Sequence, residues 1–213
     1  MRHRQKLQAA LFCALLAGIQ SLPVAAAQHK NADLVKATEV VSEKLKSEPN
    51  DIAKLFQRAA LHFALQKYDL ALFDLNHILK LDEKNASAYF LRSNTYLSLK
   101  QYQAALADID KSLSLSKDNN IDKLFQRSNC HYMLSQDSEA ISDLEQILKA
   151  GTVTAEQKLM SYANLAEIKF HLGQYNECLA DCSKAIAIDP RGCGGSAYYW
   201  RAESAKALKN MAL

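Results

Sequence analysis

The cysteine and histidine residues are the first candidates for chemistry in this sequence. Cys178 and Cys182 are four residues apart on an expected helix, and Cys193 follows in a glycine-rich loop. Together with His171 they suggest a metal site, but they lack the CxxC spacing that is typical of zinc sites. We expect buried thiols, with a disulfide between Cys182 and Cys193 as the alternative in an oxidising environment. A metal or thiol protein is the less favoured function.

Other motifs of catalysis do not accompany these residues. His62 and His131 stand at matching places of an internal repeat, on the face of a helix that must be buried, which favours packing over catalysis. The sequence has no glycine-rich phosphate loop, no GxSxG motif and no HExxH motif. We therefore predict a protein that is not an enzyme and that needs no cofactor.

Arginine and aspartate recur at a fixed spacing that suggests paired side chains. Three arginines each precede an aspartate by 16 residues, and the pairs are Arg58 with Asp74, Arg92 with Asp108, and Arg127 with Asp143. The fourth copy holds Leu165 and Asp181. The spacing predicts partly buried, charge-assisted hydrogen bonds across a helical hairpin. The alternative is independent surface charges that contribute roughly 0 to 1 kcal/mol each.

The arginine spacing belongs to a longer repeat. Residues 54–58 and 123–127 both read Lys-Leu-Phe-Gln-Arg, and looser versions stand at 89–93 and 199–202. Small residues recur at intervals of 34, 35 and 38 residues, at Ala71, Ala105, Ala140 and Cys178. Twelve residues before each lies another small residue: Ala59, Ser93, Ser128 and Ala166. Small residues that face each other let two antiparallel helices cross closely.

In these features the sequence resembles the tetratricopeptide repeat (TPR) family, whose units are helical hairpins of about 34 residues. Tyrosine fills the turn position at Tyr68, Tyr102 and Tyr175, and Asp137 departs from it. The resemblance covers about residues 52–213. It implies an all-α fold, an α-solenoid of TPR hairpins in a right-handed superhelix with a flanking helix at each end.

The expected divisions and helices follow from the same register. The divisions are a signal peptide at 1–27, an N-terminal flanking helix at 28–51, four repeats at 52–85, 86–119, 121–154 and 159–192, and a capping helix or incomplete fifth repeat at 193–213. Among the helices expected are 31–46, 52–66, 70–81, 103–115 and 196–210, while the first helix of the fourth repeat is expected to begin near 159.

The first 27 residues have the pattern of a cleaved signal peptide. Basic residues precede a mostly apolar run at 7–16, and Pro23 and three alanines follow, so we expect cleavage near Ala27. A membrane anchor is less favoured, because the run is shorter than the roughly 20 residues that span a bilayer. We predict an exported protein, periplasmic or secreted, with the endoplasmic reticulum lumen as the alternative.

Loss of the signal peptide changes the charge balance. It removes three of the 26 basic residues and no acidic ones, which leaves 23 of each. A nucleic-acid-binding protein would need a basic stripe. We expect neither a nucleic-acid partner nor stable membrane insertion after cleavage.

The resemblance implies that the first helices of the repeats line a concave groove. One stripe on them is rich in large apolar groups, which often mark an interaction surface, and in asparagine, which can pair with a peptide backbone. Alternatively, the phenylalanines wedge between first helices as core. The predicted groove residues are Phe56, Phe63, Phe90, Asn94, Phe125, Asn129, Tyr132 and Phe170.

The function predicted from this groove is a non-catalytic scaffold that binds a peptide or protein partner. The alternative is a chaperone-like TPR module for unfolded chains in the endoplasmic reticulum lumen. Some TPR domains grip acidic chaperone tails with basic and polar residues. Here Phe56, Phe90 and Phe125 stand at those positions, so we do not expect an acidic chaperone tail as the partner.

Overall fold

A computed structural model describes residues 24–116, 120–190 and 195–211, and every regular element in them is a helix. The chain divides into two compact units, 1–83 and 84–213. Most of the predicted signal peptide, residues 1–23, lies outside the described residues, as does Cys193.

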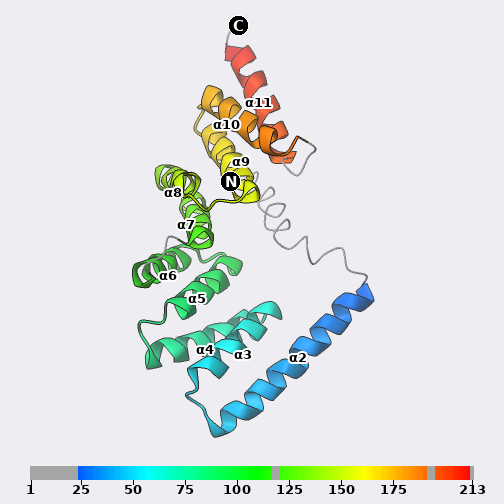
Figure 1. Ribbon diagram of the computed structural model, residues 1–213, viewed down its shortest axis with the longest axis vertical. Helices are drawn as coiled ribbons and strands as arrows, with labels where there is room; N and C mark the ends of the chain where they lie inside the picture. Colours follow the sequence, from blue (N-terminus) through cyan, green and yellow to red (C-terminus); the bar gives the residue numbers. More distant parts are fainter. Residues whose placement is uncertain (1–23, 117–119, 191–194, 212–213) are drawn as a thin grey trace. The chain divides into compact units, whose positions relative to one another are not determined.

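The first unit contains one long helix and one helical hairpin (Figure 1). Its helices are α2 (Val24–Ser47), α3 (Ile52–Ala64) and α4 (Tyr68–Leu81). Helix α2 packs against α3 through Val41 and Leu45, which are both buried. It begins seven residues before the expected start at residue 31. Asp51 caps α3, because its carboxylate accepts a hydrogen bond from the backbone N–H of Lys54 at 2.9 Å.

The second unit contains three hairpins and a final helix (Figure 1). Each hairpin packs against the next, and α11 packs on both helices of the hairpin before it. The helices are α5 (Ala86–Ser98), α6 (Tyr102–Leu115), α7 (Ile121–Met133), α8 (Asp137–Lys149), α9 (Ala155–His171), α10 (Tyr175–Ile188) and α11 (Gly195–Met211).

Helix α9 begins four residues earlier than the repeat register indicates. Thr154 accepts a hydrogen bond from the backbone N–H of Gln157 at 3.2 Å, and the Gln157 side chain accepts one from the backbone N–H of Thr154 at 3.0 Å. This reciprocal capping box satisfies two donors at the start of the helix and adds a turn to it.

The four hairpins share one turn conformation. The residue that follows each first helix by two positions has a positive φ: 58° at Gln66, 60° at Lys100, 60° at Ser135 and 75° at Gly173. Glycine adopts this left-handed conformation at no steric cost, whereas other residues lose roughly 1–2 kcal/mol there. The turn tyrosines open the second helices α4, α6 and α10, one or two residues earlier than expected.

The helices of each hairpin meet at the predicted small residues. All eight are buried, at most 3% exposed. In the third hairpin the Ser128 hydroxyl donates to the backbone carbonyl of Ala140 at 3.1 Å, so the crossing is close enough for a direct bond between the helices. The predicted spacing of small residues thus marks the helix crossings.

The three predicted arginine–aspartate pairs are all present, each within its own hairpin. Nε and Nη2 of Arg58 donate to Asp74 at 2.8 and 2.6 Å, and those of Arg92 donate to Asp108 at 2.7 Å each. Arg127 makes the same two bonds to Asp143 at 2.9 and 2.5 Å. The aspartates are buried, and their carboxylates raise the pKa of each arginine.

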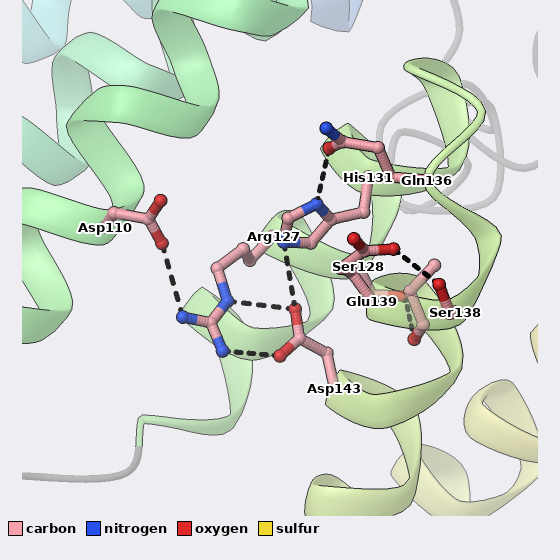
Figure 2. Close-up of polar contacts among 9 residues, drawn as sticks. Asp110, Arg127, Ser128, His131, Gln136, Ser138, Glu139 and Asp143 are labelled. Carbon is pink, nitrogen blue, oxygen red and sulfur yellow. Dashed lines mark hydrogen bonds and ion pairs between the residues drawn. The ribbon is translucent and has the colours of Figure 1, made fainter.

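The third pair has additional partners (Figure 2). Nη1 of Arg127 donates to Asp110 of the preceding hairpin at 3.2 Å. Nε2 of His131 lies 3.9 Å from Asp143, and its Nδ1 lies 2.8 Å from the side-chain oxygen of Gln136. The pair within one hairpin is thereby linked to its neighbour.

The fourth hairpin uses a lysine in place of the arginine. Leu165 stands at the arginine position and is buried in the core. One helical turn later, Nζ of Lys169 donates to Asp181 at 2.5 Å, and Lys184 donates to the other carboxylate oxygen at 3.0 Å.

The alignment of residues 199–202 with the Lys-Leu-Phe-Gln-Arg segments is wrong. Ala197, Trp200 and Ser204 are the buried residues of α11, and Arg201 is exposed, with its guanidinium 5.1 Å from the Tyr198 ring centre. The small residue of α11 is therefore Ser204, 38 residues after Ala166. Trp200 precedes it by four residues, as Leu55 precedes Ala59.

We predict that Asp108→Ala lowers the free energy of unfolding by about 2–4 kcal/mol, because it leaves the Arg92 guanidinium largely buried without its carboxylate. The double variant Arg92→Met/Asp108→Leu should lose clearly less, because no uncompensated charge remains. Urea unfolding followed by circular dichroism measures both. Glu145→Ala, which breaks the exposed pair with Lys149, is the control and should cost under about 1 kcal/mol. Equal losses in the double and single variants would contradict a coupled pair.

Candidate functional site

The predicted groove residues lie on the first helices of the hairpins. In the first unit, Phe56 and Phe63 are both partly exposed on α3, and the Phe63 ring lies 5.8 Å from that of Tyr68. In the second unit, the stripe runs along α5, α7 and α9, with Phe90, Asn94, Phe125 and Phe170 partly exposed, Asn129 exposed and Tyr132 buried.

Phe90 and Phe125 of the second unit pack against other side chains and are also partly exposed. Nζ of Lys123, on α7, lies 5.8 Å from the ring centre of Phe90, on α5, and donates to the Ser116 hydroxyl at 2.6 Å. Lys123 is itself buried. Phe125 packs against the core that α7, α8 and α9 share. Each ring thus has one side against protein and leaves part of its surface exposed.

Asn94 has a side-chain oxygen that lacks a hydrogen-bond donor in the described part of the chain. The atom is buried, although the residue as a whole is partly exposed. An amide oxygen in this state costs roughly 1–3 kcal/mol.

A polar and aromatic cluster occupies the stripe between α7, α9 and α11. The Tyr132 hydroxyl donates to Oε1 of Glu167 at 3.2 Å, and Glu167 is buried. The His171 ring centre lies 5.7 Å from that of Phe170, 5.2 Å from that of Trp200 and 6.4 Å from that of Tyr132. Of the predicted residues, the structure therefore brings Tyr132 and Phe170 together around His171.

Glu167, like His171 and Trp200, belongs to this cluster but not to the eight predicted groove residues. It follows the small residue Ala166, as Asn94 follows Ser93 and Asn129 follows Ser128. The repeat register places it on the same stripe, but the predicted set contains only aromatic and amide side chains.

The thiols of the described residues lie in the core. Cys130, Cys178 and Cys182 are free and buried, and Sγ of Cys178 lies 3.9 Å from Sγ of Cys182. Hydrogen bonds from Cys182 and, at 3.0 Å, from the Ser204 hydroxyl lower the pKa of Cys178, against the effect of burial. The bond to Cys178 and burial raise the pKa of Cys182.

A metal site finds no support in the described part of the chain. No group there of three or more cysteine, histidine, aspartate or glutamate residues is placed to hold an ion. His171 is exposed, and its ring contacts are aromatic. Cys178 and Cys182 occupy the places of a small residue and a core residue in the other hairpins. None of the helices described is long and apolar enough to cross a membrane.

Comparisons with known proteins agree with this architecture. Models of the tetratricopeptide repeat match residues 86–119 and 160–191. The chain is an α-solenoid of helical hairpins. The two matched segments are tetratricopeptide repeats by sequence, and the fold of the described residues is that of a TPR solenoid. A search of curated protein sequences finds no match.

Several solved structures share the fold at low sequence identity. YrrB, described as a TPR protein with an unusual peptide-binding site, is 19% identical over 81% of this chain and 86% of its own, with a TM-score of 0.67. PilW, described as a widely conserved type IV pilus biogenesis factor, is 19% identical over 85% of this chain and 81% of its own, with a TM-score of 0.68. MamA is 17% identical over 80% of this chain and 96% of its own, with a TM-score of 0.67.

His62 is a buried histidine whose pKa differs between the folded and the unfolded chain. It is buried on α3, its Nδ1 finds no hydrogen-bond partner among the described residues, and burial lowers its pKa. The Asp74 carboxylate raises this pKa in part, while Arg58 and Lys67 lower it further. The folded chain therefore binds a proton at His62 less readily than the unfolded chain does.

We predict that the free energy of unfolding decreases as the pH falls below the unfolded-state pKa of about 6.5, because protonation then favours the unfolded chain. His62→Phe should flatten this part of the profile, measured by urea unfolding at a series of pH values. His77→Gln, at a histidine that pairs with Asn50 at 3.0 Å, is the control and should keep the slope of the wild type. An unchanged slope in His62→Phe would show that other groups control the dependence.

Proposed function

We propose that this protein is an exported, non-catalytic scaffold that binds an extended segment of a partner protein on the first helices of its second unit. The observation that carries the proposal is the unsatisfied side-chain oxygen of Asn94 within a stripe of partly exposed phenylalanines. An extended peptide has backbone N–H groups that can donate to such an oxygen, and apolar side chains at regular intervals that can pack on the phenylalanines.

The stripe suits a peptide in both its polar and its apolar parts. Asn94 and Asn129 each provide an amide that can accept from and donate to a peptide backbone. The exposed parts of Phe90 and Phe125 offer apolar surface, worth about 25 cal/mol per Å² removed from water. A rigid helical scaffold keeps these groups in place, which reduces the entropy lost on binding.

The similar proteins support a binding role. The peptide-binding site in the description of YrrB belongs to that protein, and so does the role of PilW in pilus biogenesis. A shared TPR solenoid makes a peptide or protein partner the natural expectation for this chain. Among the described residues of the stripe, the polar groups are two amides and a carboxylate bonded to tyrosine, which do not form a nucleophile with its base.

The first test uses an array of short, extended peptides of randomised sequence, with binding of the purified protein confirmed by fluorescence anisotropy. Phe90→Ala and Asn94→Ala should each weaken the peptides that bind by roughly tenfold, the scale of a residue at the centre of an interface. Phe90→Ala should lower the free energy of unfolding by less than about 2 kcal/mol, because the ring is only partly buried.

Phe73→Ala is the matched control. Phe73 lies on the second helix α4 and is 67% exposed, so its loss should leave peptide binding unchanged. A large loss of stability in Phe90→Ala with no selective loss of binding would show that the phenylalanines are core. If no peptide of the array binds, the proposed function is wrong.

Export has its own test. The signal-type pattern of residues 1–27 predicts that the full-length chain, expressed in a host with a general secretory pathway, appears in an exported fraction. N-terminal sequencing should begin at Gln28. Replacement of Ala25 and Ala27 by Arg should block the cleavage and leave the larger precursor. Recovery of the uncleaved wild-type chain in the cytosol would overturn the proposed export.

A further inference from the structure

An exposed apolar face lies along α4 in the first unit. The side chains of Phe73, Leu70 and Leu81 are 67%, 48% and 42% exposed. His77, which is partly exposed, stands between them in the sequence. The four residues follow one another at intervals of three, four and four, which is the spacing of one continuous helix face. We call these four residues the α4 face.

The large side chains of the α4 face are a departure from the repeat. The corresponding residues of the other three second helices are small or acidic: Ala104 and Ala107 in α6, Glu139 and Ser142 in α8, and Glu177 and Ala180 in α10. The packing of a hairpin therefore does not require Leu70 or Phe73. Large apolar side chains that are exposed together usually mark an interaction surface.

Two opposite charges lie beside the α4 face. Asp69 is in the first turn of α4 and Lys80 is in the last. Both are exposed, and neither forms an ion pair with another described residue. Eleven residues are close to three full turns, so the two charges lie on the same side of the helix. The surface of α4 is thus negative at one end, apolar in the middle and positive at the other end.

We propose that the α4 face binds a second copy of this chain, with the two α4 helices antiparallel about a twofold axis near the middle of the face. Phe73 of each copy then lies against His77 of the other, and Asp69 of each lies beside Lys80 of the other. A parallel pair would instead bring like charges together. A helix face with opposite charges at its two ends is therefore complementary to itself in the antiparallel arrangement.

The size of this contact predicts a weak and reversible dimer. A helix of 14 residues is about 21 Å long, so one pair of helices buries less than the roughly 1,600 Å² of a standard interface. We expect a dissociation constant on the order of 100 µM that rises with salt, because the charge pairs are exposed. The dimer does not depend on the proposed peptide binding, which uses the first helices of the second unit.

Sedimentation velocity of the purified protein, at concentrations on both sides of this value, measures the dimer. Phe73→Asp introduces a charge at the centre of the contact and should raise the dissociation constant by about tenfold or more. Val40→Asp is the matched control, because Val40 is an apolar residue of α2 in the same unit and is 55% exposed. It should keep the wild-type constant. Thermal unfolding followed by circular dichroism verifies that both variants are folded.

An exchange of the charges tests the antiparallel arrangement. Asp69→Lys and Lys80→Asp each bring like charges together twice, and each should weaken the dimer by about threefold or more at low salt. An equimolar mixture of the two variants again has two pairs of opposite charges and should dimerise as the wild type does. These variants keep the apolar residues, so they decide the question even if Phe73→Asp does not fold.

The outcomes are distinct from those of the peptide-binding test. A wild-type protein that is monomeric at all these concentrations would overturn the inference, whether another part of the chain or a different protein covers the α4 face. A dimer that persists in Phe73→Asp would place the contact elsewhere and would also overturn it. If the mixture of charge variants does not recover the dimer, the antiparallel arrangement is wrong. Each of these results leaves the proposed peptide binding as it stands.

Discussion

The buried ion pair within each hairpin is the constraint on which the rest of the structure depends. Two parallel hydrogen bonds from arginine to aspartate have a defined geometry, so they fix the register of the first helix against the second. The small residues then meet at the crossing, where all of them are buried. A register shift of one residue would separate the charges and place large side chains at the crossing, so one alignment is strongly favoured.

The fourth hairpin shows that the buried aspartate needs a positively charged partner, which can be a lysine in place of the arginine. Asp181 is buried like the other aspartates, and Lys169 reaches it from one turn further along the first helix. Leu165 then fills the arginine position as a core residue. Lysine is a single flexible point charge, and Lys184 supplies the second bond that the planar arginine supplies elsewhere.

The sequence was sufficient to predict the features that repeat. The hairpins and the three ion pairs follow from fixed spacings, because equal spacing in equal helices produces equal contacts. The role of Lys169, the register of α11 and the early start of α9 are departures from the repeat, and they depend on which side chain can reach a partner in three dimensions. For the same reason, Phe90 and Phe125 could not be assigned to groove or core from spacing, since both rings contact protein on one side.

A rigid repeat confines variation to a few positions of each first helix. The residue after the small residue is an example: it is Ala60 in the first unit, and Asn94, Asn129 and Glu167 in the three hairpins of the second. The ion pair and the helix crossing do not involve this position, so its chemistry can change without loss of the fold. Because neighbouring hairpins of the second unit pack in sequence, the order amide, amide, acid along the chain becomes an order along the stripe. The stripe therefore has a polarity that the repeat alone does not have.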